Sequence, residues 1–260
     1  MRSPFKAAFL TAIVLTAFQG QAYAGAWLQK KGHGLLILST TMLSSGQVLD
    51  AAGHSVNIPR YNRFDVDAWL EYGLTDRMTL VFRPQFRSVS LAKPYDLHYA
   101  GIGYTALGVR VGLWSSSETV FSLQSLLRIP GDPLVGASQF ETDTRLLYGH
   151  SFRLGTWPAF IDTEFAYRFR GGVVPDEIRS DVTFGIRPRP DAMVMAQGFS
   201  TFSFGRAGGF YAAGWEYKTA LSLVWDFAEN WSVQVGGIAT VAGANTLRER
   251  GYFAAVWKRF

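Results

Sequence analysis

The most constraining feature of this sequence is a strict alternation of apolar and charged side chains, clearest over residues 160–170. The odd positions carry isoleucine, threonine, phenylalanine, tyrosine and phenylalanine, while positions 162, 164, 168 and 170 carry aspartate, glutamate, arginine and arginine. Successive side chains of a β-strand point to opposite faces of the sheet. This stretch is therefore predicted to be a strand that separates an apolar region from a polar one, and the pattern recurs along nearly the whole chain.

The first 24 residues have the features of a secretion signal. Arg2 and Lys6 supply a positive start, residues 7–18 form an apolar run too short for a stable membrane span, and residues 22–24 read Ala-Tyr-Ala. We therefore expect residues 1–24 to be a signal peptide and residues 25–260 to be the mature chain. A membrane-anchoring helix is the alternative interpretation of this segment.

Composition narrows the function classes. The formal charge of +5 falls to about +3 without Arg2 and Lys6, and the arginines are dispersed among acidic residues, so no nucleic-acid partner is expected. The absence of cysteine excludes disulfides and thiolate chemistry. The sequence has neither a Gly-rich phosphate loop nor a metal-ligand cluster, and we expect no cofactor.

The alternation predicts twelve strands. Every second connection is a short turn, at residues 73–77, 115–117, 154–157, 189–191 and 227–229, whereas the intervening connections are mostly longer. Short periplasmic turns and longer extracellular loops are typical of outer-membrane barrels. The predicted strands cover about residues 35–45, 61–72, 78–88, 98–114, 118–129, 139–153, 158–170, 177–188, 192–204, 209–226, 230–242 and 250–260.

These features predict an all-β fold, a transmembrane antiparallel up-and-down β-barrel in the bacterial outer membrane, with lipid as its surroundings. A soluble β-sandwich is the structural alternative, since local alternation fits both.

Five tryptophans fall near the predicted periplasmic ends and are expected to form an aromatic girdle there. The last strand ends on Phe260 and resembles the signal through which the barrel-assembly machinery recognises its clients. The girdle residues are Trp114, Trp157, Trp225, Trp231 and Trp257.

The same alternation assigns a set of charged side chains to the barrel interior, where they would line a lumen. They are Asp65, Asp67, Glu71, Arg83, Arg87, Arg110, Arg128, Glu141, Asp143, Arg145, Asp162, Glu164, Arg168, Arg170, Glu177, Arg179, Asp181 and Arg187.

Because strands run up and down in turn, the heights of these charges can be compared. Arg168 and Arg170 are expected beside Glu141, Asp143 and Glu177 at the outer end. Arg87 is expected beside Asp65 and Asp67, and Arg187 beside Asp162. Opposite charges on neighbouring strands can pair, and unpaired charge in a narrow lumen is costly. Two interpretations follow: a charge ladder that fills and stiffens a closed barrel, or a polar channel whose charges select solutes.

Three segments resemble a known family. Residues 68–80 contain the turn Gly-Leu-Thr-Asp-Arg, residues 101–110 form a Gly-rich strand ending in Leu-Gly-Val-Arg, and residues 122–131 close in a Pro-Gly loop. They resemble the outer-membrane family named for the MetA pathway of phenol degradation, whose members are described as transporters. This chain has Thr105 where members often carry an acidic residue. The resemblance implies uptake of aromatic compounds.

We therefore expect a passive channel or transporter for small solutes, aromatic compounds among them, and no enzyme activity. A structural or surface-interaction barrel with a closed, salt-bridged lumen is the main alternative. A remote one is a rim protease like the omptins, since residues 65–67 read Asp-x-Asp and residues 96–98 read Asp-x-His near the extracellular end. Carboxylates flanking a histidine would activate water as a general base.

Overall fold

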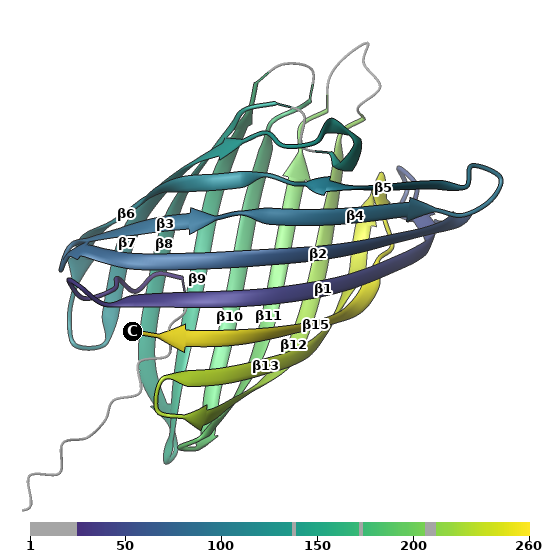
Figure 1. Ribbon diagram of the computed structural model, residues 1–260. Helices are drawn as coiled ribbons and strands as arrows, with labels where there is room; N and C mark the ends of the chain where they lie inside the picture. The colour runs from purple at the N-terminus through teal and green to yellow at the C-terminus, as the bar shows by residue number, and fades with distance from the viewer. Residues whose placement is uncertain (1–24, 137–138, 172–173, 206–211) are drawn as a thin grey trace, which may run out of the picture.

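The chain folds into a closed antiparallel β-barrel of twelve strands, as predicted (Figure 1). The structure is a computed structural model that describes residues 25–136, 139–171, 174–205 and 212–260. The expected signal peptide, residues 1–24, lies outside the described residues. In the described part of the chain, no helix is both long and apolar enough to cross a membrane.

Ten barrel strands are continuous, and two are each built from two pieces. One further short strand pairs with the end of β1. The pieces β3 and β4 form one barrel strand, β5 and β6 form the next, and β14 pairs with the end of β1. The bounds are β1 Gly34–Leu49, β2 Ser55–Thr75, β3 Met78–Arg83, β4 Gln85–Leu91, β5 Leu97–Ile102, β6 Thr105–Ser115, β7 Thr119–Ile129, β8 Glu141–Leu154, β9 Trp157–Arg170, β10 Glu177–Arg189, β11 Ala192–Ser203, β12 Gly214–Ala228, β13 Trp231–Ala244, β14 Thr246–Leu247 and β15 Arg250–Arg259.

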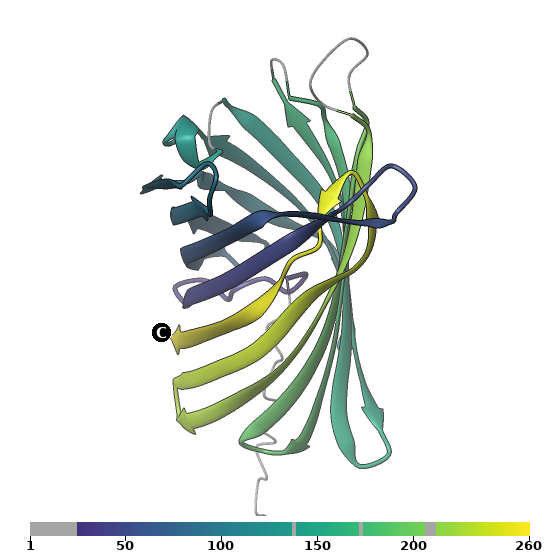
Figure 2. The ribbon, with the colours of Figure 1, turned by 90° about the vertical axis from the view of Figure 1, so that its right-hand side faces the viewer.

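The barrel closes at β1, which pairs with both β2 and β15. On one side Leu35 lies opposite Glu71, and on the other it lies opposite Arg259. Figure 2 shows the last strands of the chain running beside the first ones. Because the ladder continues around the ring, the backbone N–H and C=O groups of the wall are paired within the protein, as a hydrocarbon environment requires.

Two predicted strands are interrupted, and both interruptions lie toward the extracellular half. Pro84 separates β3 from β4, because proline has no N–H to give to the ladder. The strand predicted at 98–114 breaks after Ile102. At this break Ile102 pairs with the loop that contains the short helix η1 (Pro133–Val135): the Asp132 N–H donates to the carbonyl oxygen of Ile102 at 2.7 Å. The strand predicted to begin at 209 begins at Gly214, and residues 206–211 lie outside the described part.

The outer face of the barrel is apolar, and its ends carry aromatic side chains. Trp114, Trp157, Trp225 and Trp231 are all exposed near the periplasmic ends of their strands, as expected for an aromatic girdle. Trp257 was wrongly placed in that girdle. It is only 4% exposed and packs into the interior, since its partner residue on β1, Ile37, belongs to the inward-facing set.

Leu221 tests which face of β12 meets lipid. It lies in the middle of that strand and is 63% exposed, whereas its neighbour Ala220 is buried. Leu221→Arg is expected to destabilise the barrel by about 2–4 kcal/mol in bilayers, because a charge would enter the hydrocarbon. The measurement is urea unfolding of the refolded protein in lipid vesicles, followed by tryptophan fluorescence.

The matched control is Tyr95→Arg, at an exposed position in the loop between β4 and β5. That change should leave the unfolding free energy within about 0.5 kcal/mol of the wild type. An equal loss of unfolding free energy in both variants would contradict the assignment of this face to lipid.

Candidate functional site

The predicted lumen residues lie buried or half-buried on the face of the wall opposite the exposed apolar side chains. On β9, for example, Phe165, Tyr167 and Phe169 are exposed, whereas Asp162 and Arg168 are buried. The same strands therefore carry apolar side chains on the outer face and polar side chains, at alternate positions, on the inner face. Most of its charges form ion pairs between strands, and many of these pairs fall into three groups.

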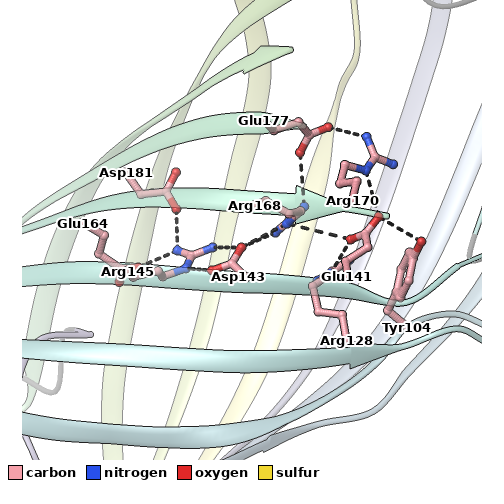
Figure 3. Close-up of polar contacts among 10 residues, drawn as sticks. All are labelled: Tyr104, Arg128, Glu141, Asp143, Arg145, Glu164, Arg168, Arg170, Glu177 and Asp181. Atoms are coloured by element: carbon pink, nitrogen blue, oxygen red, sulfur yellow. Dashed lines mark hydrogen bonds and ion pairs between the residues drawn. The ribbon is translucent and has the colours of Figure 1, made fainter. Parts of the chain in front are cut away.

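The first group surrounds Glu141 at the extracellular half of β8 (Figure 3). The Glu141 carboxylate accepts hydrogen bonds from Arg128 Nε at 2.8 Å, Arg170 Nε at 2.8 Å and Tyr104 OH at 2.9 Å. Arg170 also contacts Glu177 at 2.6 Å. The predicted meeting of Arg170 with Glu141 and Glu177 is confirmed, and Tyr104 is a partner that strand periodicity did not identify.

Arg168 and Arg145 hold the second group together below the first. Arg168 Nη2 lies 2.8 Å from Asp143, the pairing expected from strand order. Arg145 Nη1 contacts Glu164 at 2.6 Å and Asp181 at 3.0 Å, while its Nε bonds Asp143 (Figure 3). One guanidinium thus joins three carboxylates from three strands, which matches the fork of donors that arginine carries.

The third group lies on β2 and its neighbours. Arg87 Nε bonds Asp65 at 2.7 Å, as predicted. Asp67 was expected beside Arg87 too, but it pairs with Arg83 at 2.9 Å, because Gln85 and Arg87 occupy successive inward positions of β4 and Asp67 lies opposite Gln85.

Arg187 was also assigned the wrong partner. It bonds Asp226 of β12 at 2.7 Å and does not pair with Asp162. The strand order places both carboxylates at the periplasmic end, and the arginine turns away from β9 across β11. Periodicity gives the face and level of a side chain but not the direction in which a long one reaches.

The feature that sequence reasoning missed is the segment of residues 25–33, which enters the barrel interior at its periplasmic end. Its backbone is tied to the wall: Ala26 N–H donates to Asp162 at 2.7 Å, Gln29 N–H to Thr79 at 2.9 Å, and Arg110 Nη1 to the carbonyl oxygen of Trp27 at 2.9 Å. These contacts reach β9, β3 and β6, so the segment crosses the lumen. Its short length and lack of alternation gave no strand signal.

Side chains of the segment fill the space that remains. Trp27 packs edge-on against Phe160 with ring centroids 6.0 Å apart, and Ala26 is buried among Val120 and Leu147. At Gly149 a Cβ would collide with the Trp27 ring, so the wall is hollowed by glycine where the indole lies. The segment therefore lies across the periplasmic part of the lumen, where Trp27 packs against a buried apolar cluster of the wall that includes Phe160, Met193 and Trp257.

Arg110 anchors the polar side of this segment and is itself almost fully buried. It donates to Glu71 at 2.7 Å and to Gln124 at 2.8 Å, and Gln29 of the segment donates to the other oxygen of Glu71 at 2.8 Å. One shared carboxylate thus connects the wall arginine with the segment.

Arg179 differs from the other predicted lumen arginines. Among the described residues it takes part in no ion pair; its side chain is half-buried, and the buried Nε atom has no hydrogen-bond partner. It lies on the inner face of β10, opposite Ala166 and Thr201. A half-buried guanidinium that forms no ion pair keeps donors free, so this position is suited to an anionic ligand.

The two acidic pairs of the protease interpretation do not converge. Asp65 and Asp67 face inward and bind arginines, whereas His98 lies on the outer face, where its Nε2 is 3.1 Å from the hydroxyl of Ser88. His98 faces outward because Arg87 and its partner Gly101 face inward, so Ser88 and His98 lie on the opposite face of the wall. In the described part of the chain, no three histidine, aspartate or glutamate side chains are grouped to hold a metal ion.

A hollow of about 1250 Å³ lies on the barrel wall, but it is not the lumen. Most of its lining comes from outward-facing positions, and these include Met42, Leu221 and Tyr252, the last of them 78% exposed. It is therefore a saddle on the lipid-facing side, apart from the charged interior.

Comparison with known proteins identifies the fold. No family model matches the sequence, and no curated protein matches it significantly, so the family resemblance rests on short segments. An outer membrane channel from Pseudomonas putida F1 is 14% identical, with a TM-score of 0.75 over 91% of this chain and 98% of that one. The NanC porin is 9% identical, with a TM-score of 0.53 over 85% and 98% of the two chains. The fold is therefore that of outer-membrane β-barrels.

The three carboxylates around Arg145 provide a stability test. Arg145→Met is expected to cost about 3–5 kcal/mol, because buried carboxylates lose their shared cation. The unfolding free energy is measured with urea in lipid vesicles at pH 7. The control is Arg189→Met, which removes an exposed pair with Asp191 and should cost no more than about 1 kcal/mol. Equal losses would refute the role of Arg145.

Proposed function

We propose that this protein is an outer-membrane channel for the passive passage of small solutes, and that residues 25–33 control its periplasmic exit. The observation that carries the proposal is a polar, charge-lined interior within a closed barrel, crossed near its periplasmic end by one short segment. The fold shared with an outer membrane channel over nearly the full length supports it. The solute class implied by the family resemblance is aromatic.

The segment is the part best suited to move. The wall strands are held by continuous ladders on both sides, so opening them would break many backbone hydrogen bonds. Residues 25–31, by contrast, contact the wall through a few single hydrogen bonds and the packing of Trp27. Withdrawal of the segment toward the periplasm would open the lower lumen without disturbing the barrel.

Arg179 is the residue that we propose contacts solutes. The other interior arginines nearby already form ion pairs with carboxylates and stabilise the barrel wall. They are Arg145, Arg168 and Arg170. An anionic solute would supply the partner that Arg179 lacks, and a carboxylate attached to a small aromatic ring fits both this charge and the class that the resemblance implies. The outer-membrane location follows from the same proposal, as does recognition by the barrel-assembly machinery through the strand that ends at Phe260.

The principal rival is a structural or surface-interaction barrel with a permanently closed lumen. The density of ion pairs around Glu141 and Arg145 favours it. The two proposals differ in whether the segment ever leaves the lumen, and this can be tested because the chain has no native cysteine.

Tethering the segment should abolish conduction reversibly. The Ser122 hydroxyl donates to the Ala26 carbonyl oxygen at 2.9 Å, so Ala26→Cys with Ser122→Cys places cysteines at two residues that are in contact. In planar bilayers the oxidised protein is expected to show few openings, and a reductant should restore those of the wild type. Free-thiol titration confirms the bond, and each single variant serves as a control.

Identical conductance before and after reduction would rule out the segment as the gate. A wild-type barrel that folds, shows heat-modifiable migration and never conducts would favour the closed structural barrel.

Reversing the charge at Arg179 should change ion preference. Arg179→Glu is expected to shift the reversal potential in a salt gradient toward cation selectivity, because a free positive charge in the lumen becomes negative. Lys93→Glu, an equal charge change in an exposed extracellular loop, is the control and should shift it much less. A reversal potential that does not differ between the two variants would exclude Arg179 from the conduction path.

A further inference from the structure

We propose that Asp162 and Glu164 form a binding site for the α-ammonium group that processing after Ala24 creates at Gly25, and that this ion pair locks the segment of residues 25–33 in the lumen. The inference rests on the predicted signal cleavage and deepens the proposed gating. It assigns a partner to two interior carboxylates and makes maturation of the chain a condition for closing the channel.

The position of Gly25 carries the geometry. A Cβ built on Gly25 would collide with the carboxylate of Glu164 and lie 3.5 Å from Asp162 Oδ1. The nitrogen of Gly25 is bonded to the same Cα, so it is attached to the atom beside which these carboxylates lie. The next backbone nitrogen, that of Ala26, already donates to Asp162 at 2.7 Å. The two carboxylates therefore meet the chain at the first residue of the mature protein.

The Asp162 carboxylate beside Gly25 also lacks an ion-pair partner among the described residues. Asp162 is 2% exposed, and among the described residues it forms no ion pair; its hydrogen-bond partner is the neutral N–H of Ala26. Glu164 bonds Arg145, but that guanidinium is shared with Asp143 and Asp181. A buried carboxylate without a counter-charge is costly, and the cost falls on the site where the new terminus would lie.

Cleavage supplies the missing charge. Hydrolysis of the bond between Ala24 and Gly25 adds the hydroxyl of one water to the Ala24 carbonyl and its hydrogen to the Gly25 nitrogen. At neutral pH the products are a carboxylate on the released peptide and an ammonium on the mature chain. In the uncleaved chain the same nitrogen is a neutral amide, which cannot balance Asp162.

Glycine at position 25 fits this role. Any side chain there would displace Glu164 from the space beside the terminus, whereas glycine lets both carboxylates approach. The lock would act at the first residue of the segment, while Arg110 and Glu71 hold its middle through Trp27 and Gln29.

The experiment measures the reactivity of the α-amino group. Mature protein that begins at Gly25 is refolded, treated with a limiting amine-reactive ester at pH 7, and digested so that mass spectrometry reports labelling at Gly25 and at Lys31. Lys31 lies on the same segment but is exposed, and it serves as an internal reference. Relative to Lys31, Gly25 is expected to react at least about tenfold more slowly than in the unfolded chain.

Two variants show whether the carboxylates cause this protection. Asp162→Asn with Glu164→Gln should restore fast labelling of Gly25, whereas Asp67→Asn, an interior carboxylate on β2 that pairs with Arg83, should not. A chain extended by Gly-Ser-Gly-Ser before Gly25 keeps every side chain but moves the ammonium away, and its terminus should also react fast. Heat-modifiable migration confirms that each variant has folded.

Equal labelling of Gly25 in the mature and doubly substituted proteins would overturn the proposal, as would a mature terminus other than Gly25 in protein isolated from outer membranes. Labelling requires no conductance, so the two proposals can fail separately. A protected Gly25 in a barrel that never conducts would refute the channel and leave the lock intact.

Discussion

Pairing of backbone polar groups between neighbouring strands around a closed ring is the constraint on which the rest of this structure depends. In a bilayer each unpaired N–H or C=O costs several kcal/mol, so the sheet can have no open edge in the hydrocarbon. The pairing of β1 with both β2 and β15 satisfies this condition. It also fixes which side chains face inward, because the alternation along each strand cannot slip by one residue without placing Arg168 or Asp143 in lipid.

Closure creates an interior with its own electrostatic requirement. Charges removed from bulk water need partners, and neighbouring strands supply them at matched heights. Glu141, which accepts from Arg128, Arg170 and Tyr104, and Arg145, which donates to three carboxylates, bring four consecutive strands and Tyr104 into one network (Figure 3). Where the network leaves a charge without a partner, at Arg179 and at Asp162, the two positions face different ends of the lumen and suit different ligands: a solute and the terminus of the chain itself.

The sequence was sufficient to predict the strands and their faces, because a period of two is a direct readout of a sheet with unlike sides. It predicted the meeting of Arg168 and Arg170 with Asp143, Glu141 and Glu177, where partners lie on adjacent strands at one level. The prediction failed where the direction of a long side chain, or its packing against neighbours, determines its partner. Arg187 extends to Asp226, and Trp257 turns inward among Leu35 and Met193. Residues 25–33 have no periodicity, and their only sequence signal is the apolar Ala-Trp-Leu of residues 26–28, which follows Gly25 after the predicted cleavage site.

With residues 25–33 as a movable segment, the charge ladder and the selective channel are no longer alternatives, because one barrel can be both. A barrel wall whose ion pairs are saturated is rigid, and rigidity of the wall is what lets a short segment act as the moving part. The segment is held by several single hydrogen bonds and one aromatic contact, each worth about 0.5–1.5 kcal/mol, and by the proposed ion pair at Gly25. Interactions of this size permit a closed state that is favoured yet reversible. The same ladder that fills the interior therefore makes gating by residues 25–33 physically possible.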